Sequence, residues 1–235
     1  MHNAGENAYL CLFDTKIVKM SDMLTPETLA GSLLDIGAVL LRPEKPFVWA
    51  SGWHSPIYCD NLRILSSPSL RSAVGEAFAA LIARKYPDAE VVAGVATGAI
   101  AVGVLAADRL GKPFAYVRPK PKDHGTGSQI EGVLPAGAKV VVVEDLISTG
   151  MSSLAAVDAL RKAGATVLGM TAIFTYGFDL AAERFAESKV ALDTLSNYHA
   201  LIAEARNRGL VDEAQADILR AWRRSPAEWG QNPCV

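Results

Sequence analysis

Hydrophobic residues are arranged in alternating runs along the middle of this chain. Four mainly apolar runs predict strands: 91–95, 113–118, 139–144 and 166–174. Apolar residues at helical spacing predict helices between these runs: 99–110 and 152–163. The four valines at 140–143 are typical of a strand that is buried on both faces. Strands that alternate with helices predict an α/β fold, in which helices flank a central, mostly parallel sheet.

The segment ahead of these strands carries recognisable helix boundaries. Thr25 followed by Pro26 is a helix start, and this helix is expected to run to about Gly37. Pro68 opens a second helix, which should end at Tyr86 because a proline follows it. Both helices therefore precede the alternating region.

The remaining segments have weaker patterns. Residues 42–62 are rich in proline and aromatic side chains and predict short strands and turns. Residues 119–132 form a polar segment between two predicted strands. The last 50 residues are expected to be helical, with one helix over 212–224. Residues 1–22 are interpreted as an extension ahead of the domain.

Composition and charge reduce the number of possible functions. The 235 residues are 50% hydrophobic, which suffices for a sizeable core, and their net charge of −2 argues against broad binding to nucleic acid. The cysteines and histidines are widely scattered, so neither a zinc site nor a disulfide framework is expected, and a reducing cytoplasm fits best. The uncharged run 91–107 is interrupted by glycines and is interpreted as strand, turn and helix rather than a membrane span.

One predicted strand end carries many polar side chains, in the sequence VVVVEDLISTGMSS at 140–153. The valines lead into Glu144 and Asp145, which are followed by hydroxyl residues, a glycine and a helix. Backbone N–H groups at a helix start lack helical partners and favour an anion such as phosphate. The segment is neither a Walker A loop nor a GxGxxG turn.

The two adjacent acids decide which phosphate ligand fits. Carboxylates repel a phosphate unless a cation or sugar hydroxyls lie between them, and they accept strong hydrogen bonds from vicinal hydroxyls. The phosphate cradle and the acidic pair together predict binding of a phosphorylated sugar. The alternative is an ordinary helix start after a buried strand, with solvated acids.

The segment RPKPKDHGTGSQIEG at 118–132 concentrates positive charge. Arg118, Lys120, Lys122 and His124 lie within seven residues, beside glycines and small polar residues that supply little packing. Such an arm suits a diphosphate leaving group, whose negative charge grows as its bond to the sugar breaks. The alternative is a solvated basic loop.

These segments resemble those of a known family. Residues 140–152 are similar to the signature of the phosphoribosyltransferases, which bind 5-phosphoribosyl 1-diphosphate (PRPP). Segments 118–132 and 47–61 (FVWASGWHSPIYCDN) resemble orotate phosphoribosyltransferases in particular, and the likeness extends over about residues 24–230, including a terminal AWRRSP. It implies the type I phosphoribosyltransferase fold. It also implies transfer of the phosphoribosyl group to orotate, giving orotidine 5′-monophosphate and diphosphate in pyrimidine (UMP) biosynthesis.

The resemblance further implies an organisation and partners. The domain would span 23–235, with a small hood at about 23–65 plus the C-terminal helices and a core at about 66–190. A loop at 118–132 that reaches the neighbouring subunit implies a homodimer. Mg²⁺ is implied as cofactor, bound mainly through PRPP and not by protein ligands. A cytoplasmic enzyme with no nucleic-acid or membrane partner is expected.

The same resemblance assigns roles to individual residues. The expected catalytic residues are Lys122, Glu144 and Asp145. The residues expected to contact PRPP are Arg118, Lys120, Lys122, His124, Glu144, Asp145, Leu146, Ile147, Ser148, Thr149, Gly150, Met151 and Ser152. Orotate is expected to contact Ser148 and Tyr58, although the aromatic residues of segment 47–61 equally suit a hydrophobic core. The turn 96–99 resembles the family's diphosphate-binding loop.

Some positions depart from the family pattern. Met151 stands where a second glycine is usual, so an ordinary helical φ is expected there. Ala50, Thr97 and Gly98 stand where some members carry basic or aromatic residues, so the arm at 118–124 must supply more of the diphosphate contacts.

Other functions share parts of this pattern. A purine-type phosphoribosyltransferase should lack the KDHG arm, and a non-catalytic PRPP sensor would usually carry a DNA-binding module. An enzyme that also decarboxylates the product would need a further barrel domain of about 250 residues.

Overall fold

The computed structural model describes residues 24–49, 52–121 and 128–230. Its centre is a six-stranded sheet with the strand order β10-β9-β8-β5-β6-β7. The strands are β5 (Val91–Val95), β6 (Phe114–Val117), β7 (Ile130–Glu131), β8 (Lys139–Ile147), β9 (Thr166–Thr175) and β10 (Leu192–Asn197). All neighbours pair in parallel except β7, which is antiparallel to β6. The predicted α/β fold with a mostly parallel sheet is confirmed.

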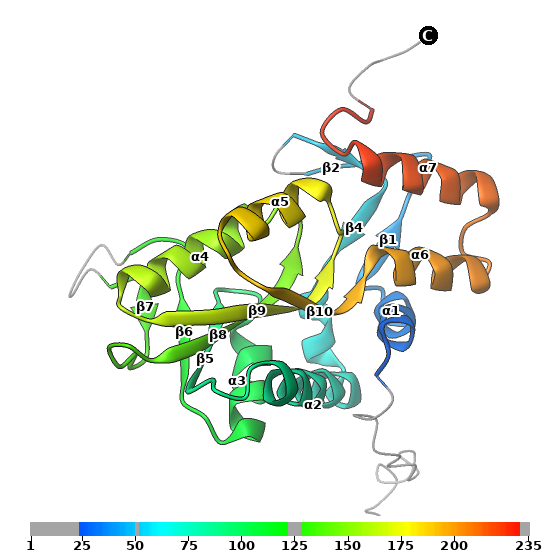
Figure 1. Ribbon diagram of the computed structural model, residues 1–235. Helices are drawn as coiled ribbons and strands as arrows, with labels where there is room; N and C mark the ends of the chain where they lie inside the picture. Colours follow the sequence, from blue (N-terminus) through cyan, green and yellow to red (C-terminus); the bar gives the residue numbers. More distant parts are fainter. Residues whose placement is uncertain (1–23, 50–51, 122–127, 231–235) are drawn as a thin grey trace, which may run out of the picture.

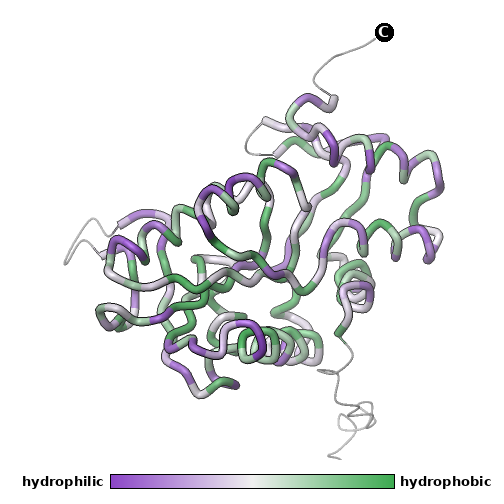
Figure 2. Tube along the Cα trace, viewed as in Figure 1, coloured by the Kyte–Doolittle hydropathy of each residue, from purple (hydrophilic) through white to green (hydrophobic). Residues whose placement is uncertain are grey.

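Helices cover both faces of the sheet. They are α1 (Pro26–Asp35), α2 (Pro68–Lys85), α3 (Ile100–Leu110), α4 (Met151–Lys162), α5 (Asp179–Glu187), α6 (Tyr198–Asn207) and α7 (Glu213–Arg224). Helices α2 and α3 lie on one face and α4 and α5 on the other, while α6 and α7 stand at one end (Figure 1). Hydrophobic residues concentrate along the central strands and on the inward sides of the helices (Figure 2).

Local sequence rules account for several features of these elements. The valines at 140–143 are 0% exposed, as expected for a strand covered on both faces. The Thr25 hydroxyl accepts a hydrogen bond from the Thr28 N–H and caps α1. Gly111 ends α3 in the left-handed conformation, at φ 60°, which glycine adopts without a Cβ clash. The sequence therefore encodes these boundaries locally.

A small antiparallel region precedes the main sheet, where short strands were predicted. Strand β1 (Val39–Leu41) pairs with β4 (Ile57–Cys59), and β2 (Phe47–Val48) pairs with β3 (His54–Ser55). A 3-10 helix, η2 (Asn61–Ser66), connects this region to α2. The short strands lie beside α7 (Figure 1). The boundary between a hood and a core stays a prediction.

Two strands of the main sheet were missed. The prediction that the last 50 residues are all helical is wrong, because Leu192–Asn197 forms β10 in parallel with β9. Its sequence LDTLSN has few β-branched or aromatic residues. Its strand conformation is therefore determined by pairing at the edge of the sheet and not by local propensity. Ile130–Glu131, inside the polar segment, forms β7 by pairing with β6.

None of the helices in the described ranges combines the length and the apolar character that crossing a bilayer requires.

Candidate active site

The chain reverses its direction of travel across the sheet between β5 and β8. Strand β6 lies on one side of β5 and β8 on the other, so the crossovers diverge at this point. In open α/β sheets, such a switch point at the carboxyl ends of the strands is the usual ligand site. The last β5–β8 pair is Gly94 with Val143, and Glu144 and Asp145 follow directly. The predicted acidic pair therefore lies at the switch point.

The start of α4 borders the acidic pair. Gly150 is left-handed, at φ 77°, and a Cβ at this position would lie 2.8 Å from Phe185 Cε2, so only glycine fits. Arg184 Nη1 donates to the Thr149 carbonyl over 3.0 Å and fixes the loop from outside. Met151 opens the helix with φ below zero, as predicted. The first backbone N–H groups of α4 thus face the carboxyl end of β8.

Glu144 is a buried acid. The residue is 6% exposed, and its Oε2 atom has no hydrogen-bond partner among the described residues. Burial, together with the neighbouring Asp145 charge, raises the pKa of Glu144 well above its ordinary value. An unpaired buried oxygen is costly, so this carboxyl is suited to a ligand that donates a hydrogen bond.

Asp145 is held from two sides. The Asn61 amide, 3% exposed, donates from Nδ2 to the Asp145 carbonyl over 2.7 Å. A Cβ at Gly98 would overlap the Asp145 carboxylate, so the turn after β5 contacts this acid closely. Burial raises the pKa of Asp145 and the Asp60 charge adds to the rise, while backbone N–H bonds at Asp145 and Leu146 oppose it.

A cavity of about 260 Å³ adjoins the acidic pair. Its lining comes from four separate parts of the chain: Val48, Trp49, Tyr58, Cys59, Leu146, Ser148 and Tyr176. Tyr58 is 47% exposed, so its ring is available to a ligand and is not part of the core. The structure thus brings the two predicted orotate contacts, Tyr58 and Ser148, to one cavity.

The two tryptophans of segment 47–61 pack against other aromatic rings at this cavity. Trp49 donates to the Ile57 carbonyl over 3.3 Å and packs against Tyr176, with ring centroids 5.3 Å apart. Trp53 stacks on Trp49 at 6.5 Å. Both tryptophans therefore belong to the hydrophobic packing, which was the alternative interpretation for them.

Helix α7 holds this aromatic wall in place. Trp222 donates from Nε1 to the His54 carbonyl over 3.1 Å. Arg223 donates to the carbonyls of Tyr176 and Gly177 over 3.1 and 2.6 Å. These residues, part of the AWRRSP segment, received no predicted role. Their contacts span more than forty residues and leave no periodic signal in the sequence.

Asn61 and Cys59 were also missed. The Cys59 thiol donates to Asn61 Oδ1 over 3.3 Å, and burial raises the pKa of this thiol, so it stays protonated. Because Cys59 lines the cavity and Asn61 holds the Asp145 backbone, this chain of contacts joins the cavity to the acidic pair. The signal available in the sequence was the run Cys59-Asp60-Asn61, which leads into the start of η2.

The structure describes residues 118–121 and 128–132 of the basic arm. Arg118 pairs with Glu131 over 3.5 Å, and its backbone bonds to Gln129. Arg118 also lines a smaller cavity of about 110 Å³ with Ser152, at the end of β5. Lys120 is exposed. Lys122 and His124 lie outside the described residues.

Glu144 and Asp145 place two adjacent carboxyl groups at the end of β8. Within the described ranges, no group of three or more His, Cys, Asp or Glu side chains is arranged to hold a metal ion. Mg²⁺ commonly binds through one or two carboxylates together with substrate phosphates and water. Glu144 and Asp145 therefore fit an ion that is carried by a phosphorylated ligand.

Comparison with known proteins defines the class first. The family model "Phosphoribosyl transferase domain" matches residues 61–205. This range contains the acidic pair, the α4 start and all strands of the main sheet, so the fold is the type I phosphoribosyltransferase fold.

Curated relatives define the family within this class. The orotate phosphoribosyltransferase of Porphyromonas gingivalis is 50% identical over 202 residues, covering 86% of this chain and 96% of the relative. That of Lactococcus lactis subsp. cremoris is 49% identical over 207 residues, covering 88% and 99%. The chain belongs to the orotate phosphoribosyltransferase family.

Solved structures agree. The orotate phosphoribosyltransferase of Aeropyrum pernix has a TM-score of 0.68 and 34% identity, covering 78% of this chain and 99% of that one. That of Mycobacterium tuberculosis, in complex with PRPP, has a TM-score of 0.59 and 25% identity, covering 75% and 98%.

Proposed function

We propose that this chain transfers the 5-phosphoribosyl group from PRPP to orotate, giving orotidine 5′-monophosphate and diphosphate. The observation that carries the proposal is the cavity lined by Tyr58, Leu146 and Ser148, because Leu146 directly follows the acidic pair and Ser148 precedes the start of α4. A planar base and a phosphorylated sugar can then lie side by side at the switch point. Such a reaction supplies pyrimidine nucleotides.

The sugar phosphate would bind along one continuous segment. The backbone N–H groups of residues 148–152 surround the 5′-phosphate at the positive end of the α4 dipole. Glu144 and Asp145 accept hydrogen bonds from the ribose hydroxyls. The otherwise unpaired Glu144 Oε2 supports this role, because a ribose hydroxyl supplies the donor that it lacks in the described part of the chain.

Orotate would bind in the cavity. Ser148 offers a hydroxyl and a backbone N–H to the polar edge of the base, and the exposed Tyr58 ring offers an apolar face. Trp49 and Tyr176 close the wall behind it. Because orotate is already an anion, the reaction needs no strong general base.

The bond to diphosphate breaks as the base attacks the anomeric carbon, so positive charge develops on the sugar and negative charge on the leaving group. The carboxylates of Glu144 and Asp145 favour the cationic sugar, and Arg118, Lys120, Lys122 and His124 stabilise the departing diphosphate. Mg²⁺ bound with PRPP would neutralise part of the diphosphate charge.

Two further assignments accompany this function. A homodimer in which segment 118–132 serves the partner subunit's site would bring its basic side chains to the diphosphate bound there. A cytoplasmic location suits the widely spaced cysteines, because a reducing compartment keeps them as thiols.

The test is product formation from PRPP, orotate and Mg²⁺. The consumption of orotate and the release of diphosphate are the two readouts. We expect equimolar orotidine 5′-monophosphate and diphosphate, and loss of the reaction when Mg²⁺ is chelated. PRPP binding without any product would contradict the proposed catalytic activity and favour a non-catalytic PRPP sensor.

A further inference from the structure

The loop that begins α4 contains a backbone N–H group without a partner. Gly150 is buried, yet its N–H donates to no acceptor in the part of the chain that the structure describes. A buried N–H that lacks a partner is costly, and an anion at the start of the helix would accept its hydrogen bond. Binding of the phosphate expected at residues 148–152 therefore depends on where this N–H points.

The direction of the Gly150 N–H is fixed from α5. Arg184 Nη1 donates to the Thr149 carbonyl over 3.0 Å. This carbonyl and the Gly150 N–H belong to one trans peptide unit, in which the two groups point in opposite directions. Phe185, the next residue of α5, lies directly against Gly150. Because Arg184 holds the carbonyl on the side of α5, the N–H points away from α5.

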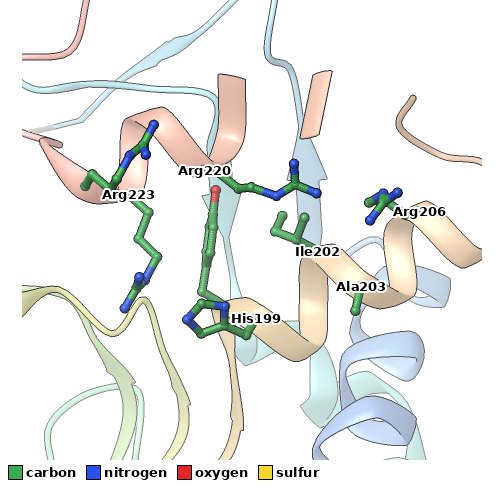
Figure 3. Close-up of a pocket in the computed structure, with 8 residues that line it drawn as sticks. His199, Ile202, Ala203, Arg206, Arg220 and Arg223 are labelled. Carbon is green, nitrogen blue, oxygen red and sulfur yellow. The ribbon is translucent and has the colours of Figure 1, made fainter. Parts of the chain in front are cut away.

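The positive charge of Arg184 is not neutralised by a carboxylate. Arg206 and Arg220, which line a cavity between α6 and α7 (Figure 3), both pair with Glu213. Arg184, in contrast, is half-buried and makes no ion pair with the carboxylates of the described residues. A cationic donor polarises the peptide that it binds, and this strengthens the N–H of the same peptide as a hydrogen-bond donor.

We propose that Arg184 is a positioning residue for the 5′-phosphate of PRPP. It turns the Gly150 N–H toward the phosphate, strengthens this donor and adds one positive charge behind the loop. The inference rests on the proposed function, because PRPP is the ligand expected at this loop. It deepens that function by naming a residue outside 148–152 on which binding of the sugar phosphate depends.

The chain contains a matched control for the Arg184 contact. Arg161 Nη1 donates to the Ser188 carbonyl, also over 3.0 Å, and this bond likewise joins α4 to the end of α5. It lies at the opposite end of α4 from residues 148–152. Arg161→Met therefore removes a similar link between the two helices without changing the phosphate loop.

The test is a titration with ribose 5-phosphate, followed through the backbone amide resonance of Gly150 in NMR spectra of the full chain. This probe carries the 5′-phosphate but no leaving group, so its binding does not require transfer to orotate. We expect a saturable shift in the unmodified chain. Arg184→Met should bind the probe about tenfold more weakly, whereas Arg161→Met should bind it as the unmodified chain does. Arg184→Lys should recover part of the affinity, because it keeps the charge.

The outcomes separate this role from the proposed reaction. Arg184→Gln removes the charge but keeps a polar side chain, and it should show the same loss if Arg184→Met does not fold. Equal affinity in Arg184→Met and the unmodified chain, or an equal loss in Arg161→Met, would overturn the role of Arg184. Probe binding that depends on Arg184, in a chain that forms no product from PRPP and orotate, would support this role and contradict the reaction. An unmodified chain in which the probe leaves Gly150 unmoved would overturn both.

Discussion

The two halves of the active site are built in different ways. The half proposed for PRPP is continuous in sequence, because the end of β8, the loop at 148–150 and the start of α4 follow one another. The half proposed for orotate is assembled from distant residues, with Tyr58 from β4, Ser148 after β8 and Tyr176 after β9. Helix α7 completes it through Trp222 and Arg223.

This difference predicts different consequences of substitution. The continuous half holds the groups that meet the charge developing during the reaction, so changes there should lower kcat. The assembled half holds the base, so changes there should mainly raise the KM for orotate. Asn61 lies between the two halves and should influence the reacting centre without contacting either substrate.

The largest effect is expected for Asp145→Asn. Removing the charge that favours the cationic sugar should lower kcat about 10²–10³-fold. Asp158→Asn, at an exposed position of α4, is the matched control and should be neutral. Steady-state kinetics and thermal unfolding are the measurements. A collapse of stability with Asp145→Asn would make this acid structural instead.

Lys122→Ala should lower kcat about 10²-fold, because the leaving diphosphate loses a cationic partner in the transition state. The KM for PRPP should change much less. Lys162→Ala, at the exposed end of α4, serves as the control. Equal losses in kcat and in PRPP binding would show that this lysine binds the ground state and the transition state alike.

Asn61→Ala should lower kcat about tenfold, equivalent to about 1.4 kcal/mol, because the Asp145 backbone loses its 2.7 Å anchor. A double-mutant cycle with Asp145→Asn is the discriminating measurement. The Asn61 effect on kcat should disappear once Asp145 is already replaced. Additive losses in the cycle would mean that Asn61 acts only on overall stability.

Ser148→Ala should raise the KM for orotate several-fold, since one ordinary hydrogen bond contributes about 0.5–1.5 kcal/mol. The backbone cradle is kept, so the KM for PRPP should stay nearly constant and provides the internal control. A selective rise in the KM for PRPP would show that the Ser148 hydroxyl contacts PRPP and not orotate.

Glu144→Gln should change stability in a pH-dependent way. Burial raises the pKa of Glu144 above its ordinary value of 4.5, so the folded chain holds this proton more tightly than the unfolded chain. Stability contributed by this group therefore falls as pH rises through the window between the two pKa values. In thermal unfolding without ligand, the free energy of unfolding of Glu144→Gln should exceed that of the unmodified chain by about 1–2 kcal/mol at mildly alkaline pH. An identical pH dependence in both proteins would contradict the buried, unpaired carboxyl.

The same contrast explains what could be predicted from the sequence. The valine strand, the acids at its end and the start of α4 each follow from local rules, so the order of elements in the continuous half could be predicted from the sequence. Strand β10 could not be predicted in this way, because its residues become a strand only by pairing with β9.

The assembled half was predicted only where the family resemblance pointed to it, at Tyr58 and Ser148. The contacts of Asn61 with Asp145 and of Arg223 with Tyr176 join residues separated by 84 and 47 positions. Such contacts arise from tertiary packing, which periodicity along the chain does not encode.

The central claim is that the assembled cavity accepts orotate beside PRPP. The most direct test is diphosphate release from PRPP and Mg²⁺ with orotate, uracil, adenine or hypoxanthine as the base. The account predicts release with orotate alone, because the cavity of about 260 Å³ pairs one aromatic face with the Ser148 donors beside the acidic pair. Release with a purine at a comparable rate would contradict the assignment of Tyr58 and Ser148 to an orotate site.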